Sequence, residues 1–255
     1  MVAYSGGVDS TFLLKAAVDT LGSENVLACI SAGPSLPKSQ YQRAIRTAKG
    51  IGVEVRTVEP NEMLDDKFTS NNADRCFHCK SHLYQVLTAI AKDNGFGHII
   101  SGHNFDDKDD FRPGNKAAQD FAIRSPLAEA CLTKEDIRQI SREMKLPTAD
   151  IPASPCLASR ISYGLEITEQ RLKQVEEAEE FMHSLGLVEF RVRHHGTIAR
   201  IEVHPKEFAM VTKEPNRSAI IKKLKSVGFK YVTFDLEGFR SGSLNESLTD
   251  EQKNI

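Results

Sequence analysis

Short apolar runs separated by amphipathic stretches mark the first part of the chain. Residues 1–3, 26–31 and 99–102 are runs of this kind, and residues 53–58 alternate apolar and polar positions. Runs of this length are typical of strands buried in a parallel sheet. Apolar residues at helical spacing lie between and after them, over residues 11–17, 38–50, 81–94 and 134–144. The alternation predicts an α/β fold with a parallel sheet and right-handed crossovers.

A different pattern begins near residue 168. Thr168 is placed to cap a helix that extends to residue 185. Residues 190–193 and 198–203 alternate as half-buried strands on either side of His195–Gly196, which predicts a hairpin. A further helix and a last strand follow, over residues 216–227 and 229–236. This order predicts a small α+β domain built on an antiparallel sheet.

The boundary between these two patterns is a proline-punctuated segment, residues 151–160. Its prolines prevent a helix at its start. A chain of 255 residues has enough length for two modest domains. We therefore predict a first domain over residues 1–160 and a second over residues 161–255.

One glycine-rich turn lies between the first predicted strand and the first predicted helix, with the sequence Ser5–Gly6–Gly7–Val8–Asp9–Ser10. Two glycines let the backbone bend sharply and approach a ligand closely. The turn amides, the helix N-terminus and the hydroxyls of Ser5 and Ser10 favour an anion such as a phosphate. Asp9 beside a phosphate suits a bridging Mg²⁺ ion. The alternative is a glycine turn that only caps a helix and binds no ligand.

The predicted strand ends add residues to this candidate site. Ligands of parallel sheets bind at the carboxyl ends of the strands, and Ser31 and Gly102 follow two of those ends. The turn lacks the Gly-Lys-Ser/Thr sequence of a Walker loop and the Gly-x-Gly-x-x-Gly sequence of a dinucleotide turn. A polar loop over residues 102–114 follows the same edge, which makes Asp110 and Arg112 further candidates.

Three of the five cysteines lie in segments of functional character: Cys76 and Cys79 form a Cys-x-x-Cys pair on a predicted loop, and Cys156 follows a proline. Such a pair places two sulfurs on one metal ion or cluster. Zinc is an alternative, with a fourth ligand from His78, His82 or His103. A redox dithiol is a second alternative, which the predicted loop position disfavours because the pair does not begin a helix. Cys29 and Cys131 are expected to serve packing.

Arginines on the second predicted domain are candidates for anion binding. Arg191 and Arg193 lie on one face of a strand, and Arg240 lies in a glycine–serine turn. Guanidinium groups suit phosphate or carboxylate ligands. The alternative is an exposed strand face on which Glu179 and Glu202 neutralise Arg191 and Arg193, and an ordinary exposed turn at Arg240.

Composition and charge narrow the class of protein. The 33 basic and 35 acidic residues give a net charge of −2, so no global field attracts nucleic acid. The sequence contains neither an apolar run of membrane-spanning length nor a signal-peptide pattern. We expect a cytoplasmic protein, and an N-terminal segment missing before the short first strand.

Five segments together resemble the LarE family of ATP-dependent sulfur transferases, which act in nickel-pincer nucleotide synthesis. They are residues 5–10, 110–114, 154–160, 191–193 and 235–242. The glycine-rich turn is similar to the PP-loop shared by the N-type ATP pyrophosphatases, and the later segments are more selective. The resemblance implies a Rossmann-like, adenine nucleotide alpha hydrolase-like first domain.

The resemblance also implies a reaction. A carboxylate of pyridinium-3,5-biscarboxylic acid mononucleotide attacks the α-phosphate of ATP, and sulfur then converts the acyl adenylate to a thiocarboxylate. It implies catalytic roles for Asp9, Lys80 and Cys156. It implies substrate contacts for four arginines of the later segments and for one glutamate of the second predicted domain. These residues are Arg160, Arg191, Arg193, Arg240 and Glu179. The sulfur donor stays open, and we expect a homo-oligomer.

The three cysteines set this chain apart from members in which a single cysteine, at the position of Cys156, gives up its own sulfur. Members with three cysteines resemble enzymes that pass on a sulfide from a 4Fe-4S cluster, which implies Cys76, Cys79 and Cys156 as ligands. Sacrifice of Cys156 without a cluster is the alternative. A tRNA-thiolating enzyme, an amidotransferase synthetase and a nucleotide-binding regulatory module are further alternatives. The first lacks a Lys/Arg-rich arm here, and the second lacks a leading catalytic cysteine.

Overall fold

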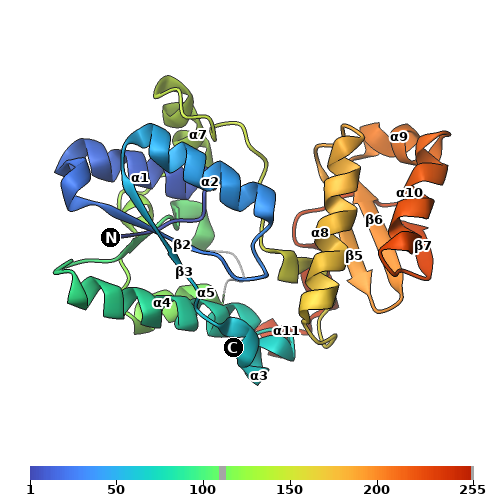
Figure 1. Ribbon diagram of the computed structural model, residues 1–255, viewed down its shortest axis with the longest axis horizontal. Coiled ribbons are helices and arrows are strands. Elements are labelled where there is room, and N and C mark those ends of the chain that lie inside the picture. Colours follow the sequence, from blue (N-terminus) through green and yellow to red (C-terminus); the bar gives the residue numbers. More distant parts are fainter. Residues whose placement is uncertain (109–112, 254–255) are drawn as a thin grey trace. The chain divides into compact units, whose positions relative to one another are not determined.

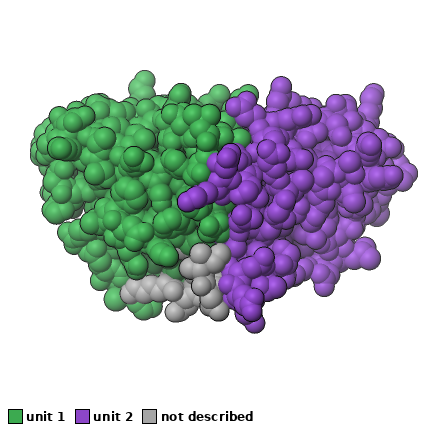
Figure 2. Space-filling view, turned by 90° about the horizontal axis from the view of Figure 1, so that it is seen from below, with its two compact units in different colours: residues 1–65, 74–154 green, residues 66–73, 155–255 purple. Residues whose placement is uncertain are grey.

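The computed structural model describes residues 1–108 and 113–253. It divides into two compact units, the first formed by residues 1–65 and 74–154 and the second by residues 66–73 and 155–255 (Figure 2). The predicted independent domains, residues 1–160 and 161–255, remain a prediction about folding. In the described part of the chain, no helix has the length and apolar character needed to cross a membrane.

Unit 1 is built on a four-stranded parallel sheet in the order β3-β2-β1-β4 (Figure 1). The strands are β1 (Val2–Ala3), β2 (Leu27–Ser31), β3 (Glu54–Val58) and β4 (Ile100–Ser101). In register, Ala3 is paired with Cys29 on one side and with Ser101 on the other. The predicted parallel sheet is confirmed, and the carboxyl ends of its strands share one edge.

Helices cover both faces of this sheet (Figure 1). The three on one face are α1 (Val8–Leu21), α2 (Lys38–Ile51) and α7 (Lys134–Glu143), and those on the other are α4 (Arg75–Asp93) and α5 (Gly114–Asp120). Their apolar stripes are buried, with Leu14, Ala44 and Ile137 on the first face and Tyr84 and Leu87 on the second. Each such large apolar side chain contributes roughly 1.5–3 kcal/mol through burial. A short helix, α6 (Pro126–Glu129), precedes α7.

Unit 2 is built on a three-stranded sheet in the order β5-β6-β7. Strands β5 (Phe190–His195) and β6 (Ile198–Val203) pair antiparallel, which confirms the predicted hairpin. Strand β7 (Tyr231–Phe234) pairs parallel to β6, so the sheet is mixed rather than wholly antiparallel. Strand β7 can run parallel to β6 because helices α9 (Phe208–Thr212) and α10 (Asn216–Ser226) connect the two strands and return the chain to the end of the sheet at which β6 begins. Helices α8 (Glu169–Ser184) and α11 (Asp250–Lys253) complete the unit.

A short excursion of the chain, residues 66–73, belongs to unit 2 and contains helix α3 (Asp66–Thr69). Its anchor is Asn71, which is fully buried and has a left-handed backbone with φ of 57°. The Asn71 Nδ2 group donates to the carbonyl oxygens of Ile161, Ser162 and Leu165. Three bonds from one amide fix this excursion to the segment that follows Cys156 in the sequence.

Helix α4 begins at Arg75, six residues before the predicted start. The prediction of a loop at Cys76 and Cys79 is therefore wrong, since both lie in the first turns of α4. The apolar stripe of α4 begins at Phe77 and continues to Tyr84, seven residues later. The polar residues around Phe77 make this stripe difficult to recognise in the sequence. The argument against a redox dithiol, that the pair does not begin a helix, is also wrong.

Candidate functional site

The glycine-rich turn joins β1 to α1 and is held by its own serines. The hydroxyl of Ser10 accepts from the Ser5 amide at 3.2 Å and lies 3.0 Å from the Ser5 hydroxyl. The N-cap of α1 is Gly7, which has no side chain, so no N-cap side chain accepts a hydrogen bond from the amides of the first turn. Amides at a helix N-terminus favour a negatively charged group. The turn has the geometry of an anion site.

Two glycines let this turn pack closely. Gly6 has φ of +72°, and a Cβ at Gly6 would lie 2.4 Å from the Cβ of Ala44 on α2. A Cβ at Gly102, after β4, would lie 2.8 Å from the Ser10 amide nitrogen. Larger side chains at either position would push the turn away from the sheet edge, which explains why glycine is required at both.

Asp9 forms an ion pair that the sequence analysis missed. Lys134 Nζ lies 2.7 Å from both carboxylate oxygens of Asp9. Lys134 is the first residue of α7, where the helix dipole disfavours a cation. A lysine at this unfavourable position was the signal in the sequence that its side chain pairs with a carboxylate elsewhere in the protein.

The strand-end candidates lie where the sequence predicts. Ser31 ends β2 and Gly102 follows β4, so both share the sheet edge with the glycine-rich turn. The remaining two candidates of this edge, Asp110 and Arg112, lie outside the described residues.

The cysteines fall into two groups by exposure. Cys29 is buried in β2, and burial raises the pKa of its thiol to about 11. On α4, Cys76 is exposed and Cys79 is half-buried. They are three residues apart and hence lie on one side of the helix. Cys156 is half-buried in unit 2, and Cys131 is exposed. Exposure therefore sets Cys29 apart from the other four cysteines, whose thiols are at least partly accessible.

The histidines proposed as a fourth zinc ligand have other neighbours. His78 Nε2 lies 3.0 Å from Asp74 Oδ2, His82 Nε2 lies 2.8 Å from Asp65 Oδ2, and His103 Nδ1 lies 3.2 Å from a serine hydroxyl. Within residues 1–108 and 113–253, three or more His, Cys, Asp or Glu side chains nowhere gather closely enough to hold a metal ion. Cys76 and Cys79 belong to unit 1 and Cys156 to unit 2, so the joint ligation of one metal by all three stays a prediction.

Lys80 lies one turn along α4 from Cys76. Its Nζ lies 5.8 Å from the centroid of the Tyr84 ring. Its side chain also limits the neighbouring helix α5, because a Cβ at Gly114 would lie 3.1 Å from the Cγ of Lys80. The position of Lys80 beside the cysteine pair is consistent with its predicted catalytic role, which no contact in the structure tests.

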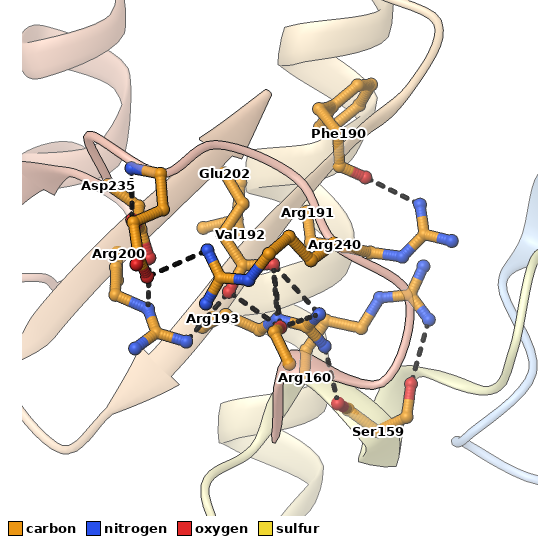
Figure 3. Close-up of polar contacts among 12 residues, drawn as sticks. Ser159, Arg160, Phe190, Arg191, Val192, Arg193, Arg200, Glu202, Asp235 and Arg240 are labelled. Atoms are coloured by element: carbon orange, nitrogen blue, oxygen red, sulfur yellow. Dashed lines mark hydrogen bonds and ion pairs between the residues drawn. The ribbon is translucent and has the colours of Figure 1, made fainter. Parts of the chain in front are cut away.

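Two arginines that donate to the Cys156 turn form buried ion pairs, and Figure 3 shows the pair between Arg193 and Glu202. Arg160 is 1% exposed, and its Nε and Nη2 each lie 3.0 Å from a carboxylate oxygen of Glu179. Arg193 is 5% exposed, and its Nε and Nη2 lie 3.0 and 2.9 Å from Glu202 Oε2. Glu202 thus neutralises Arg193, as the alternative expected, whereas Glu179 neutralises Arg160, and both pairs are buried rather than exposed.

Arg191 and Arg240 have different surroundings. The guanidinium of Arg191 lies over the ring of Phe239 at 4.9 Å, and burial, with the nearby charges of Arg160 and Arg193, lowers its pKa to about 10. It remains a cation at neutral pH, beside the two arginines that Glu179 and Glu202 neutralise. Arg240, in contrast, is paired with carboxylates of its own turn, Glu237 and Glu246.

Comparisons with known proteins agree with this arrangement. A family model described as NAD synthase matches residues 1–82, which include β1, the glycine-rich turn and α1. The chain is 42% identical to an uncharacterized protein of Synechocystis sp., over 98% of this chain and 92% of that protein. It is 37% identical to the pyridinium-3,5-bisthiocarboxylic acid mononucleotide synthase of Lactiplantibacillus plantarum, over 98% of this chain and 90% of the synthase.

A shorter likeness links the first part of the chain to other enzymes with a PP-loop. The chain is 32% identical to the NH(3)-dependent NAD(+) synthetase of Methanococcoides burtonii, over only 26% of this chain. The likeness to the synthase of L. plantarum, in contrast, covers 98% of this chain and so extends through both units. The chain belongs to the LarE family of ATP-dependent sulfur transferases, within the PP-loop superfamily.

Proposed function

We propose that this protein adenylylates a carboxylate of pyridinium-3,5-biscarboxylic acid mononucleotide and converts it to a thiocarboxylate. The observation that carries the proposal is the 37% identity to the synthase of L. plantarum over 98% of this chain. The glycine-rich turn of unit 1 and the guanidinium of Arg191 in unit 2 support it, because both substrates are anionic.

The first step uses the glycine-rich turn. A carboxylate oxygen of the nucleotide attacks the α-phosphorus of ATP, the bond to the β-phosphate bridging oxygen breaks, and pyrophosphate leaves. The amides of the turn and the first turn of α1 would bind the phosphates, and Lys134 would balance their charge. Asp9, at the positive end of α1, would hold Mg²⁺, which neutralises charge on the transferring phosphate.

The second step uses the cysteines. Sulfur attacks the acyl carbon, the bond to AMP breaks, and the thiocarboxylate remains. Cys76 and Cys79, on one side of α4, would hold a 4Fe-4S cluster with Cys156, and such a cluster supplies a bound sulfide when present. In the alternative without a cluster, Cys156 gives up its own sulfur. In both versions Cys156 lies at the point of sulfur transfer.

Anaerobic incubation with ATP, Mg²⁺, sulfide and the biscarboxylic nucleotide tests this function. We expect AMP and pyrophosphate in equal amounts, formed only when the nucleotide is present, and a thiocarboxylate product by mass spectrometry. Sulfide is omitted in a parallel reaction, in which only a sacrificial cysteine yields product. Thiolation of tRNA in place of the nucleotide would contradict the proposal and favour the tRNA-thiolating alternative.

Lys134→Ala is expected to raise the KM for ATP. The variant keeps Asp9 and the turn but loses the cation 2.7 Å from the Asp9 carboxylate. A charge-assisted contact is worth about 1.5–3 kcal/mol, so the KM for ATP rises about tenfold or more. Steady-state pyrophosphate release at saturating nucleotide measures it. An unchanged KM would confine Lys134 to a structural ion pair.

Arg191→Ala is expected to raise the KM for the nucleotide and to leave that for ATP unchanged. Its guanidinium remains positive at neutral pH, and the carboxylates nearby in unit 2, Glu179 and Glu202, form their ion pairs with other arginines, so its charge favours an anionic ligand. Loss of one charge-assisted contact costs about 1.5–3 kcal/mol, a rise of about ten- to a hundredfold in the KM for the nucleotide. A rise confined to the KM for ATP would place Arg191 at the ATP site instead.

A further inference from the structure

The main chain at Cys156 is held by an unusual number of donors. The Cys156 carbonyl oxygen accepts from the Ser159 amide at 3.0 Å, from the Ser159 hydroxyl at 2.7 Å and from Arg160 Nη1 at 3.1 Å. Arg160 Nη1 also donates to the carbonyl oxygen of Pro155. Carbonyl oxygens on both sides of the Cys156 nitrogen are therefore fixed by one guanidinium.

A second guanidinium holds the other end of the same turn. Arg193 Nη1 donates to the carbonyl oxygen of Ser159 at 3.0 Å, and its Nη2 donates to the Ser243 hydroxyl at 3.0 Å. Ser243 in turn donates to Glu202, the carboxylate that pairs with Arg193. Figure 3 shows both arginines directed at Ser159, from the turn and from β5. The turn is thus held from two elements of unit 2.

The donors of these arginines are used within the protein. A guanidinium has five N–H groups. Arg160 makes five hydrogen bonds, two to Glu179 and three, all from Nη1, to the Cys156 turn, which together engage four of its N–H groups. Arg193 makes four, and both side chains are at least nine-tenths buried. Such groups have little capacity left for a substrate.

The carboxylates explain why charged groups are tolerated here. Glu202 is fully buried and Glu179 is 8% exposed, and Glu179 also accepts from the Val192 amide at 3.0 Å. Buried ion pairs contribute little net stability compared with apolar residues of the same size. Their value is directional, because a bidentate pair fixes the plane of the guanidinium and hence the direction of its remaining donors.

We propose that Arg160 and Arg193, oriented by Glu179 and Glu202, are positioning residues that fix the main chain at Cys156 and so present its thiol in one orientation. This assignment refines the predicted substrate contacts, of which it leaves Arg191 as the anion-binding member. It rests on the proposed function in one respect, namely that Cys156 takes part in sulfur transfer. The geometry of the turn itself is independent of that function.

Hydrogen exchange of the free protein tests the positioning role without ATP or nucleotide. Arg193→Lys keeps the charge but cannot bridge Glu202 and the Ser159 carbonyl in the same fork. We expect the amides of residues 156–161 to exchange about tenfold faster, as for the loss of a charged hydrogen bond, while those of helix α10 keep their wild-type rates. Ser243→Ala, a milder change, is expected to act in the same direction. Arg217→Lys, which alters an exposed pair with Glu214, is the matched control and is expected to change neither region.

Kinetics then separate positioning from substrate binding. We expect Arg193→Lys to lower kcat for thiocarboxylate formation with an unchanged KM for the nucleotide, whereas Arg191→Lys raises that KM and leaves exchange at 156–161 unchanged. Wild-type exchange at 156–161 in Arg193→Lys and Ser243→Ala would overturn the proposal. Equal acceleration throughout unit 2 in both variants would also overturn it, in favour of a general folding role. If exchange changes as expected but no thiocarboxylate forms even in the wild type, only the proposed function fails.

Discussion

Asp9→Ala is expected to reduce formation of AMP and pyrophosphate by at least about a hundredfold. A metal contact at a transferring phosphate is worth several kcal/mol, and each 1.36 kcal/mol corresponds to about a factor of ten in rate. Asp9 lies in the first turn of α1, beside the amides that would bind the phosphates, so no neighbouring main-chain group replaces its charge. Pyrophosphate release with saturating ATP and nucleotide measures the effect.

The same helix offers a matched control for this prediction. Asp19, on the last turns of α1, forms an exposed ion pair with Lys15 at (i, i+4) spacing. Asp19→Ala removes an aspartate and an ion pair from α1 without touching the turn, and we expect wild-type turnover. Asp9→Asn keeps the shape of the side chain and is expected to lose activity as Asp9→Ala does, because the charge is what the metal requires. Near wild-type pyrophosphate release in Asp9→Ala would mean that the turn is not the ATP site.

The fold of unit 1 was largely predictable because its signals are local. A strand, two glycines and a helix within about 20 residues fix the turn, and the short apolar runs identify the remaining strands. The start of α4 was not predictable in this way, since Phe77 is the only large apolar residue between Arg75 and Lys80. Tertiary packing of that one ring, rather than a repeated pattern, extends the helix to include Cys76 and Cys79.

The candidate site was predictable in its residue types more than in its pairings. Spacing in β5 places Arg191 and Arg193 on one face, but it does not distinguish their roles. That difference depends on Glu202 from β6, which lies opposite Arg191 in register yet forms its ion pair with Arg193. The contact between Asp9 and Lys134 joins residues 125 positions apart, and no local pattern contains it.

The five cysteines differ in how well each suits iron ligation. A thiolate is the form that binds iron, and burial raises the pKa of Cys29 to about 11, so at neutral pH it is protonated in the core of unit 1. Cys131 lies in the turn between α6 and α7 with φ of 56° and has no second cysteine nearby in the sequence. Cys76 and Cys79 share one side of α4, close to its N-terminus, where negative charge is favoured. Three cysteines thus remain as candidate ligands of the proposed cluster, one fewer than the irons of a cubane.

Cys76→Ala, Cys79→Ala and Cys156→Ala are each expected to remove the visible absorption of the anaerobically purified protein and nearly all thiocarboxylate formation. Sulfur-to-iron charge transfer gives cysteine-ligated clusters this absorption, and a cluster with a missing ligand is lost or altered. Cys29→Ala and Cys131→Ala are the matched controls and should keep both colour and turnover. In all five variants pyrophosphate should still be released by the adenylylation step, because Asp9 and the glycine-rich turn are unchanged, whereas AMP is released only where sulfur transfer follows.

The outcome for Cys76→Ala separates the two sources of sulfur. A cluster held by three cysteines leaves one iron able to bind a sulfide, whereas a closed zinc site with four protein ligands has no such position. If the cluster supplies the sulfur, Cys76→Ala and Cys156→Ala lose product equally, and the wild type turns over repeatedly when sulfide is present. If Cys156 gives up its own sulfur, Cys76→Ala retains product, limited to one sulfur per chain, and mass spectrometry finds dehydroalanine at position 156. A colourless protein with one zinc per chain, or full turnover in Cys76→Ala, would exclude the cluster.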